Sequence, residues 1–92
     1  MSVGEQAVRC LVRGRVQGVW YRATAKKQAQ RLNLRGWVKN LPDGRVEAVV
    51  AGLPQAVAEF CGWLWVGPPD ASVTGVTIAE WSKEVSPGFE MT

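Results

Sequence analysis

A hairpin signal near the middle of the chain constrains the fold more than any other feature. The turn Leu41-Pro42-Asp43-Gly44 contains a proline and an Asp-Gly pair, which favour the backbone angles of a tight reversal. It separates two segments, 35–41 and 45–51, that have period-two patterns. The residues expected to share a face are Gly36, Val38 and Asn40 in the first segment and Val46, Ala48 and Val50 in the second. These patterns predict two antiparallel strands joined at this turn.

A strand and then a helix are predicted before the hairpin. Segment 7–13 alternates, with Val8, Cys10 and Val12 on one side, as in a half-buried strand. Residues 22–33 have apolar side chains at helical spacing and polar ones on the other faces. The apolar positions are Ala25, Ala29 and Leu32, and the exposed charges are expected to be Lys26, Lys27 and Arg31.

A helix and then a strand are predicted after the hairpin. The helix starts at Pro54, where a missing N–H is tolerated, and stops at Gly67-Pro68-Pro69. Its apolar stripe consists of Val57, Phe60, Cys61 and Leu64. Segment 73–81 reads as a strand with Val76 and Ile78 on one face, and the tail around Phe89 and Met91 adds a short edge strand.

The predicted order is strand, helix, strand, strand, helix, strand. This is the split βαβ arrangement of the ferredoxin-like α+β fold, with a four- to five-stranded antiparallel sheet and two helices on one face. Residues 1–92 are expected to form a single domain, since a chain of 92 residues has room for one core. Many unrelated functions occur on this fold, so function must be argued from a site.

The composition excludes several kinds of chemistry. The chain has no histidine, which removes histidine general bases and nearly all zinc sites. Its two cysteines, Cys10 and Cys61, form no Cys-x-x-Cys pair and are expected to be reduced and buried. No apolar run approaches the roughly 20 residues of a membrane span, and the first residues do not resemble a secretory signal. We therefore expect no metal, no membrane and a cytoplasmic location.

The net charge of +3 is unevenly distributed. Ten of the eleven Lys and Arg residues and two of the eight acidic residues lie in residues 1–45, which have a net charge of +8, whereas residues 46–92 have −5. A basic half favours an anionic partner, either a small phosphate compound or a nucleic acid.

The segment 14–22, Gly-Arg-Val-Gln-Gly-Val-Trp-Tyr-Arg, has the composition of an anion site. Glycines let backbone amides turn toward a common point, and a helix start adds unpaired N–H groups and a positive dipole end. Arg22, in the first helical turn, adds a guanidinium that can hold phosphate through two hydrogen bonds. Gln17 is expected to brace the loop, and Trp20 and Tyr21 to pack within it. No Gly-Lys-Ser/Thr tripeptide follows, so this is not a nucleotide-binding P-loop.

Together with segments 34–40 (Leu-Arg-Gly-Trp-Val-Lys-Asn) and 43–47 (Asp-Gly-Arg-Val-Glu), and with Gly67-Pro68-Pro69 and Val73, this loop resembles the acylphosphatase family. The resemblance covers almost the whole chain in order. It implies a ferredoxin-like enzyme that hydrolyses the carboxyl–phosphate anhydride of acyl phosphates without metal or cofactor. Departures are Trp20 at a variable position, Tyr21 for a commoner Phe, and Val66 where a basic residue often stands. They affect substrate preference more than the reaction.

The resemblance also implies roles for particular residues. Arg22 matches the phosphate-binding arginine and Asn40 the water-orienting asparagine, so both are expected to be catalytic. The residues expected to bind the substrate phosphate are Arg15, Val16, Gln17, Gly18, Val19, Trp20, Tyr21 and Arg22. The implied partners are a small acyl phosphate as substrate and inorganic phosphate as product, with no nucleic acid, on a protein expected to be monomeric.

Other interpretations remain open at this point. Taken singly, Arg22 is typical of a surface cation and Asn40 of a turn residue, and spacing alone does not bring them together. The tryptophans at 37, 63, 65 and 81 are expected to be structural. An RNA-binding module on the same fold would use the basic half, but the strand 45–51 lacks the stacking aromatics that it needs. A regulatory domain that binds a phosphate or carboxylate ligand, or a piece of a carbamoyl-transfer maturation factor, is also compatible, although the latter's zinc-binding cysteine clusters are absent.

Overall fold

The predicted hairpin is present in the computed structural model, which describes residues 4–92. Strand β2 (Arg35–Asn40) pairs antiparallel with β3 (Val46–Gly52), with Val38 opposite Ala48. Every residue of β3 is buried, because β3 is the middle strand, with the helices over one face and side chains of the neighbouring strands flanking the other. The hairpin thus lies at the centre of the fold.

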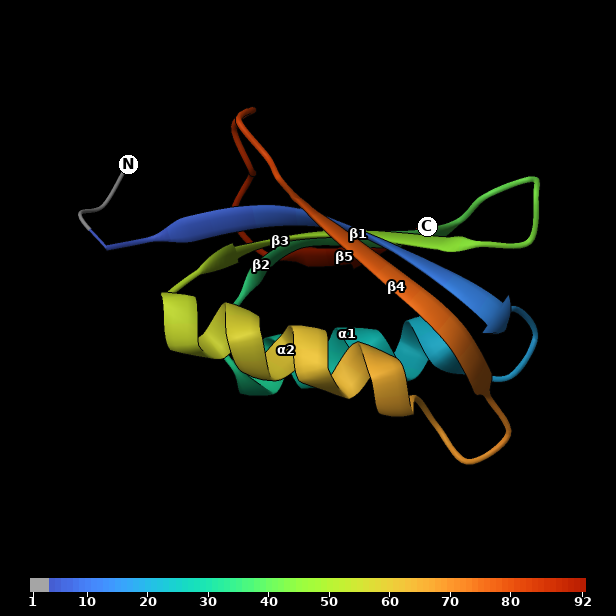
Figure 1. The fold of residues 1–92 in the computed structure, drawn as a ribbon. Coiled ribbons are helices and arrows are strands. Elements are labelled where there is room, and N and C mark those ends of the chain that lie inside the picture. Colours follow the sequence, from blue (N-terminus) through green and yellow to red (C-terminus); the bar gives the residue numbers. More distant parts are fainter. Residues whose placement is uncertain (1–3) are drawn as a thin grey trace.

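The sheet has five strands in the order β4-β1-β3-β2-β5 (Figure 1). Strand β1 (Gln6–Arg15) pairs antiparallel with β3 on one side and with β4 (Ser72–Glu80) on the other. Strand β5 (Phe89–Met91) pairs parallel with β2, so the sheet is mixed rather than fully antiparallel as predicted. The chain reverses direction after β4 and crosses to the opposite edge of the sheet, where it runs in the same direction as β2.

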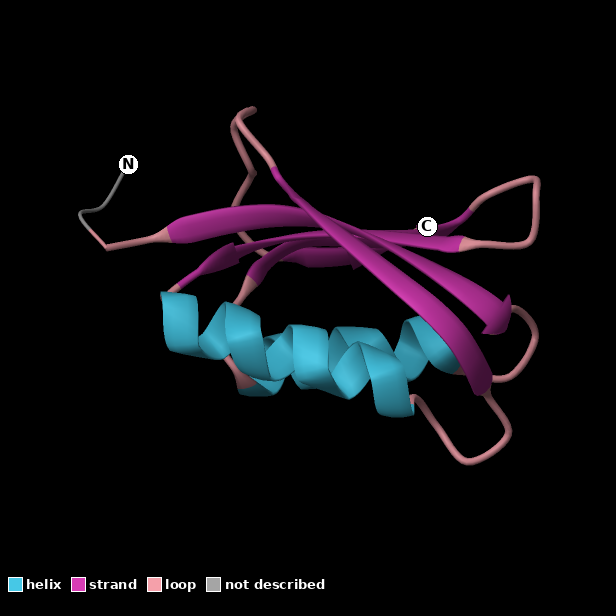
Figure 2. Cartoon of the chain, in the orientation of Figure 1, coloured by secondary structure: helices cyan, strands magenta, loops and turns pink. Residues whose placement is uncertain are grey.

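Both helices cover the same face of the sheet (Figure 2). Helix α1 (Tyr21–Arg31) buries Ala25 and Ala29 as predicted. Helix α2 (Pro54–Val66) buries three of its four predicted stripe residues, and the fourth, Cys61, is partly exposed. None of the helices in residues 4–92 is long and apolar enough to cross a membrane.

Helix α1 ends at Arg31, two residues before its predicted limit, because Asn33 adopts a left-handed conformation with φ of 58°. The amide of Asn33 bonds to the carbonyl of Gln30, and that of Leu34 to the carbonyl of Ala29. These two bonds form a Schellman ending, which satisfies the last carbonyls of the helix and turns the chain into β2.

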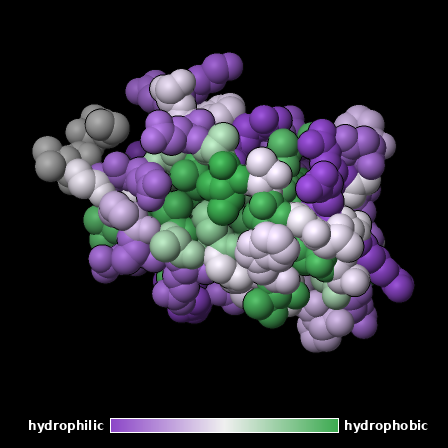
Figure 3. Space-filling model, viewed as in Figure 1, coloured by the Kyte–Doolittle hydropathy of each residue, from purple (hydrophilic) through white to green (hydrophobic). Residues whose placement is uncertain are grey.

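Strand β4 leaves part of its apolar face uncovered. Val76 packs against the core, but Ile78, on the same face of the strand, is 46% exposed. In Figure 1, β4 starts beside the end of α2 and rises away from the helices along its length. Figure 3 accordingly shows hydrophobic side chains reaching the surface on this side of the molecule.

Candidate active site

The loop from β1 to α1 is anchored in the core by two valines. Val16 and Val19 are 1% and 6% exposed, so their side chains point inward and leave the backbone of the loop at the surface. Gly18, between them, is exposed and has φ of 74°, which a residue with a Cβ rarely adopts. Two hydrophobic anchors and a glycine therefore shape a short loop whose main chain faces outward.

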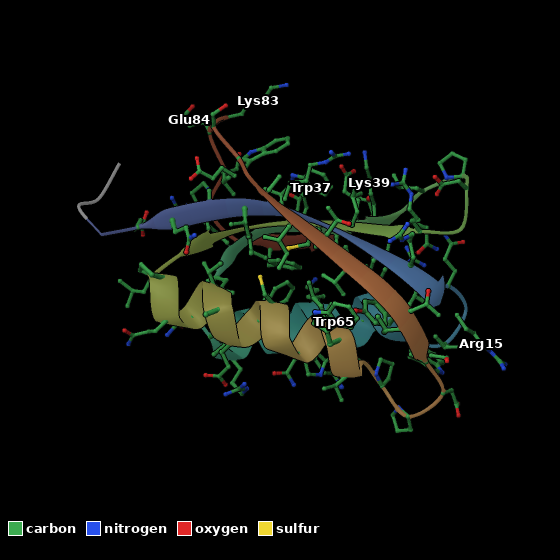
Figure 4. All side chains as sticks on the ribbon, in the orientation of Figure 1. Arg15, Trp37, Lys39, Trp65, Lys83 and Glu84 are labelled. Carbon is green, nitrogen blue, oxygen red and sulfur yellow. The ribbon has the colours of Figure 1, made fainter. Side chains whose placement is uncertain are left out.

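The loop is shorter than the predicted 14–21. Gly14 and Arg15 continue β1, with an irregularity in the pairing with β4 between Arg13 and Gly14, and Tyr21 already belongs to α1. Arg15, expected to bind phosphate, is exposed and points outward at the end of β1 (Figure 4). The irregular part of the chain is thus residues 16–20.

The amides of this loop are unpaired with the protein backbone. No carbonyl of residues 4–92 accepts a backbone hydrogen bond from Gly18, Val19 or Trp20. The first amides of α1 add to this set, because a helix start has no intrahelical acceptor for them. The result is a run of N–H donors at the positive end of the α1 dipole, which suits an anion.

Arg22 lies in the first turn of α1, as predicted, and is partly buried. Together with Gly18, Trp20 and Met91 it lines a cavity of about 330 Å³. Its Nη1 donates a hydrogen bond to the main-chain oxygen of Thr92 at 2.5 Å. A guanidinium has five N–H donors, so this bond leaves most of them for another acceptor.

Asn40 is the last residue of β2 and is partly buried. Its side-chain oxygen Oδ1 is buried and accepts no hydrogen bond within residues 4–92. A buried carbonyl without a donor costs about 1–3 kcal/mol, so proteins rarely retain one without a reason. The position of Asn40 therefore suits a group whose hydrogen-bond partner is a bound molecule.

Two sets of hydrogen bonds connect the loop and Arg22 to the end of β2. Gln17 Nε2 donates to the carbonyl oxygens of Leu41 at 2.8 Å and Arg45 at 2.9 Å, which confirms its bracing role. On the other side, the amide of Thr92 donates to the carbonyl of Val38, and Thr92 in turn accepts from Arg22. Leu41 directly follows Asn40, and Val38 lies two residues before it, so the two sets of contacts flank Asn40. The loop, Arg22 and Asn40 are thereby gathered at one end of the sheet.

The two aromatic residues of the loop differ in their environment. Tyr21 is buried, and its hydroxyl donates to the carbonyl oxygen of Leu64 at 2.5 Å. Burial raises the pKa of Tyr21 above its ordinary value, so the hydroxyl stays protonated and its role is structural. Trp20, by contrast, is 78% exposed, so the prediction that it packs within the loop is wrong.

The face of the sheet opposite the helices carries paired aromatics and charges. Trp37 and Trp81 meet edge to face with centroids 6.3 Å apart, with Lys39 over the ring of Trp37 (Figure 4). Lys39 also forms an ion pair with Glu47, and Glu47 forms a second ion pair with Arg9. The rings cover one another and the basic side chains are partly neutralised, which supports the structural role expected for these tryptophans. Within residues 4–92, no three His, Cys, Asp or Glu side chains are grouped so that they could hold a metal ion.

The contact between Arg22 and Thr92 was not anticipated from the sequence. The two residues are separated by 70 positions, and a three-residue strand brings them together. The alternation of Phe89 and Met91 indicated an edge strand, but no local pattern states which edge of a sheet such a strand joins.

The fold and the site together define a class of protein. It is a small α+β protein of ferredoxin-like topology, in which a loop with exposed backbone and an arginine in the first helical turn line a cavity. The profile of the family described as Acylphosphatase matches residues 8–91. The chain therefore belongs to the acylphosphatase family and is an enzyme of that kind, a hydrolase of class EC 3.6.1.7.

Individual relatives agree with this assignment. An acylphosphatase of Nitrosococcus oceani is 58% identical over 69 residues, which are 75% of this chain and 78% of that protein. The solved structure of an acylphosphatase from Coxiella burnetii superposes with a TM-score of 0.92 at 39% identity, covering 97% of this chain and 94% of the other. For the acylphosphatase from Bacillus subtilis the TM-score is 0.90 at 37% identity, with coverage of 94% and 97%.

Proposed function

We propose that this protein hydrolyses acyl phosphates with Arg22 and the loop amides as the phosphate site and with Asn40 as the residue that orients water. The observation that carries this assignment is the buried, unpartnered Oδ1 of Asn40, at the end of the sheet that also holds Arg22. A water molecule bound there would supply the hydrogen bond that the oxygen lacks. The same water would lie near an anion held by the loop.

The phosphoryl group is held by charge-assisted hydrogen bonds. The amides of residues 15–21 and the guanidinium of Arg22 donate to its oxygens, and each bond to a charged group contributes about 1.5–3 kcal/mol. The side chains of Val16 and Val19 do not contact the substrate, since they are buried in the core. They act by fixing the backbone that carries the donors, so that the site needs little reorganisation when charge develops.

The chemical step needs no strong acid or base. Asn40 accepts a hydrogen bond from the attacking water and holds it in line with the phosphorus atom. The water oxygen forms the new P–O bond while the bond from phosphorus to the acyl oxygen breaks, and that oxygen departs as a carboxylate. A phosphate oxygen accepts the proton of the water. Catalysis then consists of positioning and electrostatic stabilisation, which fits a chain that has no histidine.

The proposed reaction needs only one copy of the chain. Every residue assigned to it lies in the segments 15–22 and 38–41, so a monomer is sufficient. It uses neither a metal ion nor an organic cofactor, and its partners are a small acyl phosphate and inorganic phosphate rather than a nucleic acid. The two free cysteines are consistent with a reducing compartment such as the cytoplasm.

The test is an assay of phosphate release from benzoyl phosphate in the presence of a chelator. Arg22→Gln should lower kcat/KM by about 10²–10³, the loss typical when one donor to a developing oxyanion is removed. Asn40→Ala should abolish turnover and leave the affinity for inorganic phosphate nearly unchanged, because the asparagine contacts water rather than phosphate.

The matched control is Arg31→Gln, an exposed arginine at the other end of the same helix that pairs with Glu59. It should leave both activity and phosphate affinity unchanged. Full activity in Asn40→Ala would contradict the water-orienting role. Phosphate binding without turnover in the unaltered protein would favour a regulatory, non-catalytic domain.

A further inference from the structure

Trp20 occupies a strained position for which the fold gives no reason. It is the N-cap residue of α1 and has φ of 65° and ψ of 16°, a left-handed conformation that is unfavourable for a bulky side chain. Its side chain makes no capping hydrogen bond, and 78% of the residue is exposed. The indole therefore neither caps the helix nor packs in the core. Strain that serves no structural purpose is typical of functional positions.

The backbone at Trp20 is held on both sides. The carbonyl oxygen of Trp20 accepts two hydrogen bonds from Thr24, one from the amide at 3.0 Å and one from the side-chain hydroxyl at 2.8 Å. The loop on the other side is held by the buried side chain of Val19. Trp20 thus has an anchored backbone and a side chain that faces solvent.

The cavity beside Trp20 is lined by both charged and apolar residues. Its lining includes the guanidinium-bearing Arg22 and the exposed Gly18 as well as the apolar side chains of Trp20 and Met91. Met91, on β5, is 45% exposed and contributes a flexible thioether that adapts to different shapes. At about 330 Å³ the cavity lies at the lower end of the range of small-molecule pockets, roughly 300–1,000 Å³, whereas a phosphoryl group alone is smaller than such ligands.

We infer that Trp20, with Met91, is the contact surface for the acyl group of the substrate, and that the enzyme favours acyl phosphates with a flat or extended apolar acyl group over small ones. This rests on the proposed function, because the phosphoryl group must sit at Arg22 for the acyl group to reach Trp20. An indole face provides a large apolar area with little conformational freedom to lose on binding. A benzoyl group gains this contact, and an acetyl group is too small to cover much of the ring.

The experiment compares benzoyl phosphate with acetyl phosphate on Trp20→Ala and Trp20→Phe. Trp20→Ala should lower kcat/KM for benzoyl phosphate by about tenfold, mainly through KM, as expected when an apolar pocket loses a contact. The loss for acetyl phosphate and the change in the inhibition constant of inorganic phosphate should both be clearly smaller than the loss for benzoyl phosphate, because the substitution keeps the main-chain amide of residue 20 and neither ligand covers the ring. Trp20→Phe should retain most of the preference for benzoyl phosphate over acetyl phosphate that Trp20→Ala loses.

The control is Trp65→Ala, which removes another exposed tryptophan, 53% exposed on α2 and not part of the cavity (Figure 4). Trp65→Ala should leave kcat/KM unchanged for both benzoyl phosphate and acetyl phosphate. An equal loss for both substrates in Trp20→Ala, or no loss for either, overturns the acyl-group contact while the proposed function stands. An unaltered protein that cleaves neither substrate overturns the proposed function, and this inference with it.

Discussion

Gln17 and Leu41, 24 positions apart in the chain, are joined by a hydrogen bond of 2.8 Å from the side-chain amide of Gln17 to the carbonyl oxygen of Leu41. The same nitrogen also donates to the carbonyl of Arg45. One amide group therefore fixes the loop 16–20 against the hairpin that carries Asn40. The proposed mechanism requires the loop and Asn40 to be held at a fixed distance, since it assigns the phosphoryl group and the water to different elements.

Gln17→Ala should lower the free energy of unfolding by about 1–3 kcal/mol, because two hydrogen bonds of about 0.5–1.5 kcal/mol each are lost, although both carbonyls keep a backbone donor. It should also lower kcat for benzoyl phosphate, since the loop and Asn40 are no longer held together. Urea unfolding and steady-state kinetics measure the two effects. Gln30→Ala, an exposed glutamine on α1, is the control and should show neither. Unchanged kcat in a destabilised Gln17→Ala would mean that the brace serves the fold alone.

Gly14→Ala should be strongly destabilising. Gly14 has φ of 125°, and a Cβ there would lie 2.1 Å from the carbonyl oxygen of Ser72 in β4. Backbone strain and overpacking each contribute about 1–3 kcal/mol, so a loss of about 2–6 kcal/mol in the free energy of unfolding is expected. Gly62→Ala is the matched control, because a Cβ at Gly62 in α2 meets nothing within 4 Å. It should increase stability by about 0.5–1 kcal/mol, as alanine favours a helix. Similar stabilities for the two variants in urea would refute the close approach.

The parts of the molecule that the sequence predicts are those that short-range signals determine. The Asp43-Gly44 turn, the alternation around Val38 and the helical spacing of Ala25 and Ala29 all depend on neighbours in the chain, and all are confirmed. The exposure of Trp20 is different. An aromatic residue next to a valine in a loop resembles a packed residue, and only the left-handed backbone turns it outward.

Contacts between distant segments are also not predicted by the sequence. The pattern at 14–22 indicated an anion site, and the structure does place Arg22 in the first turn of α1. That Thr92 lies against Arg22, and that β5 runs parallel to β2, depends on how the chain crosses the sheet after β4. The sequence pattern also places Gly14 in the loop, whereas in the structure it belongs to β1. Its pairing with Val73 of β4 is a contact between distant segments, which no local window contains.

The ion pair between Glu5 and Arg35 should make stability depend on pH. The guanidinium of Arg35 donates to both carboxylate oxygens of Glu5, at 2.9 and 3.1 Å, and these bonds hold the pKa of Glu5 below its ordinary value of 4.5. A carboxyl group whose pKa is lower in the folded state stabilises the protein above the unfolded pKa. This contribution disappears as the pH falls through the folded pKa.

Glu5→Gln should therefore melt at a lower temperature than the unaltered protein at pH 7, and the difference should vanish well below pH 4.5. The effect should be small, because the pair is near the surface and screened by water. Calorimetry from pH 3 to 7 measures it, with Glu84→Gln, at an exposed glutamate, as the control. A difference that grows toward low pH would have the wrong sign for this ion pair.

The two cysteines should differ in reactivity although their sulfur atoms are only 3.9 Å apart. Cys10 on β1 is buried, and its contact with Cys61 together with burial raises the pKa of its thiol. Cys61 on α2 is partly exposed, and a hydrogen bond from the Cys10 thiol lowers the pKa of Cys61. Since the thiolate is the reactive form, iodoacetamide near pH 8 should label Cys61 alone in the native protein and both residues in denaturant.

The pH dependence of labelling separates the hydrogen bond from mere exposure. In Cys10→Ala, Cys61 loses the donor, so its pKa should rise and the midpoint of the rate–pH curve should move to higher pH. A cavity opened by the substitution would instead raise the plateau rate and leave the midpoint in place. Mass spectrometry of the labelled peptides gives both quantities. A midpoint that stays fixed, or Cys10 labelled before Cys61, would show that the Cys10 thiol does not stabilise the thiolate of Cys61.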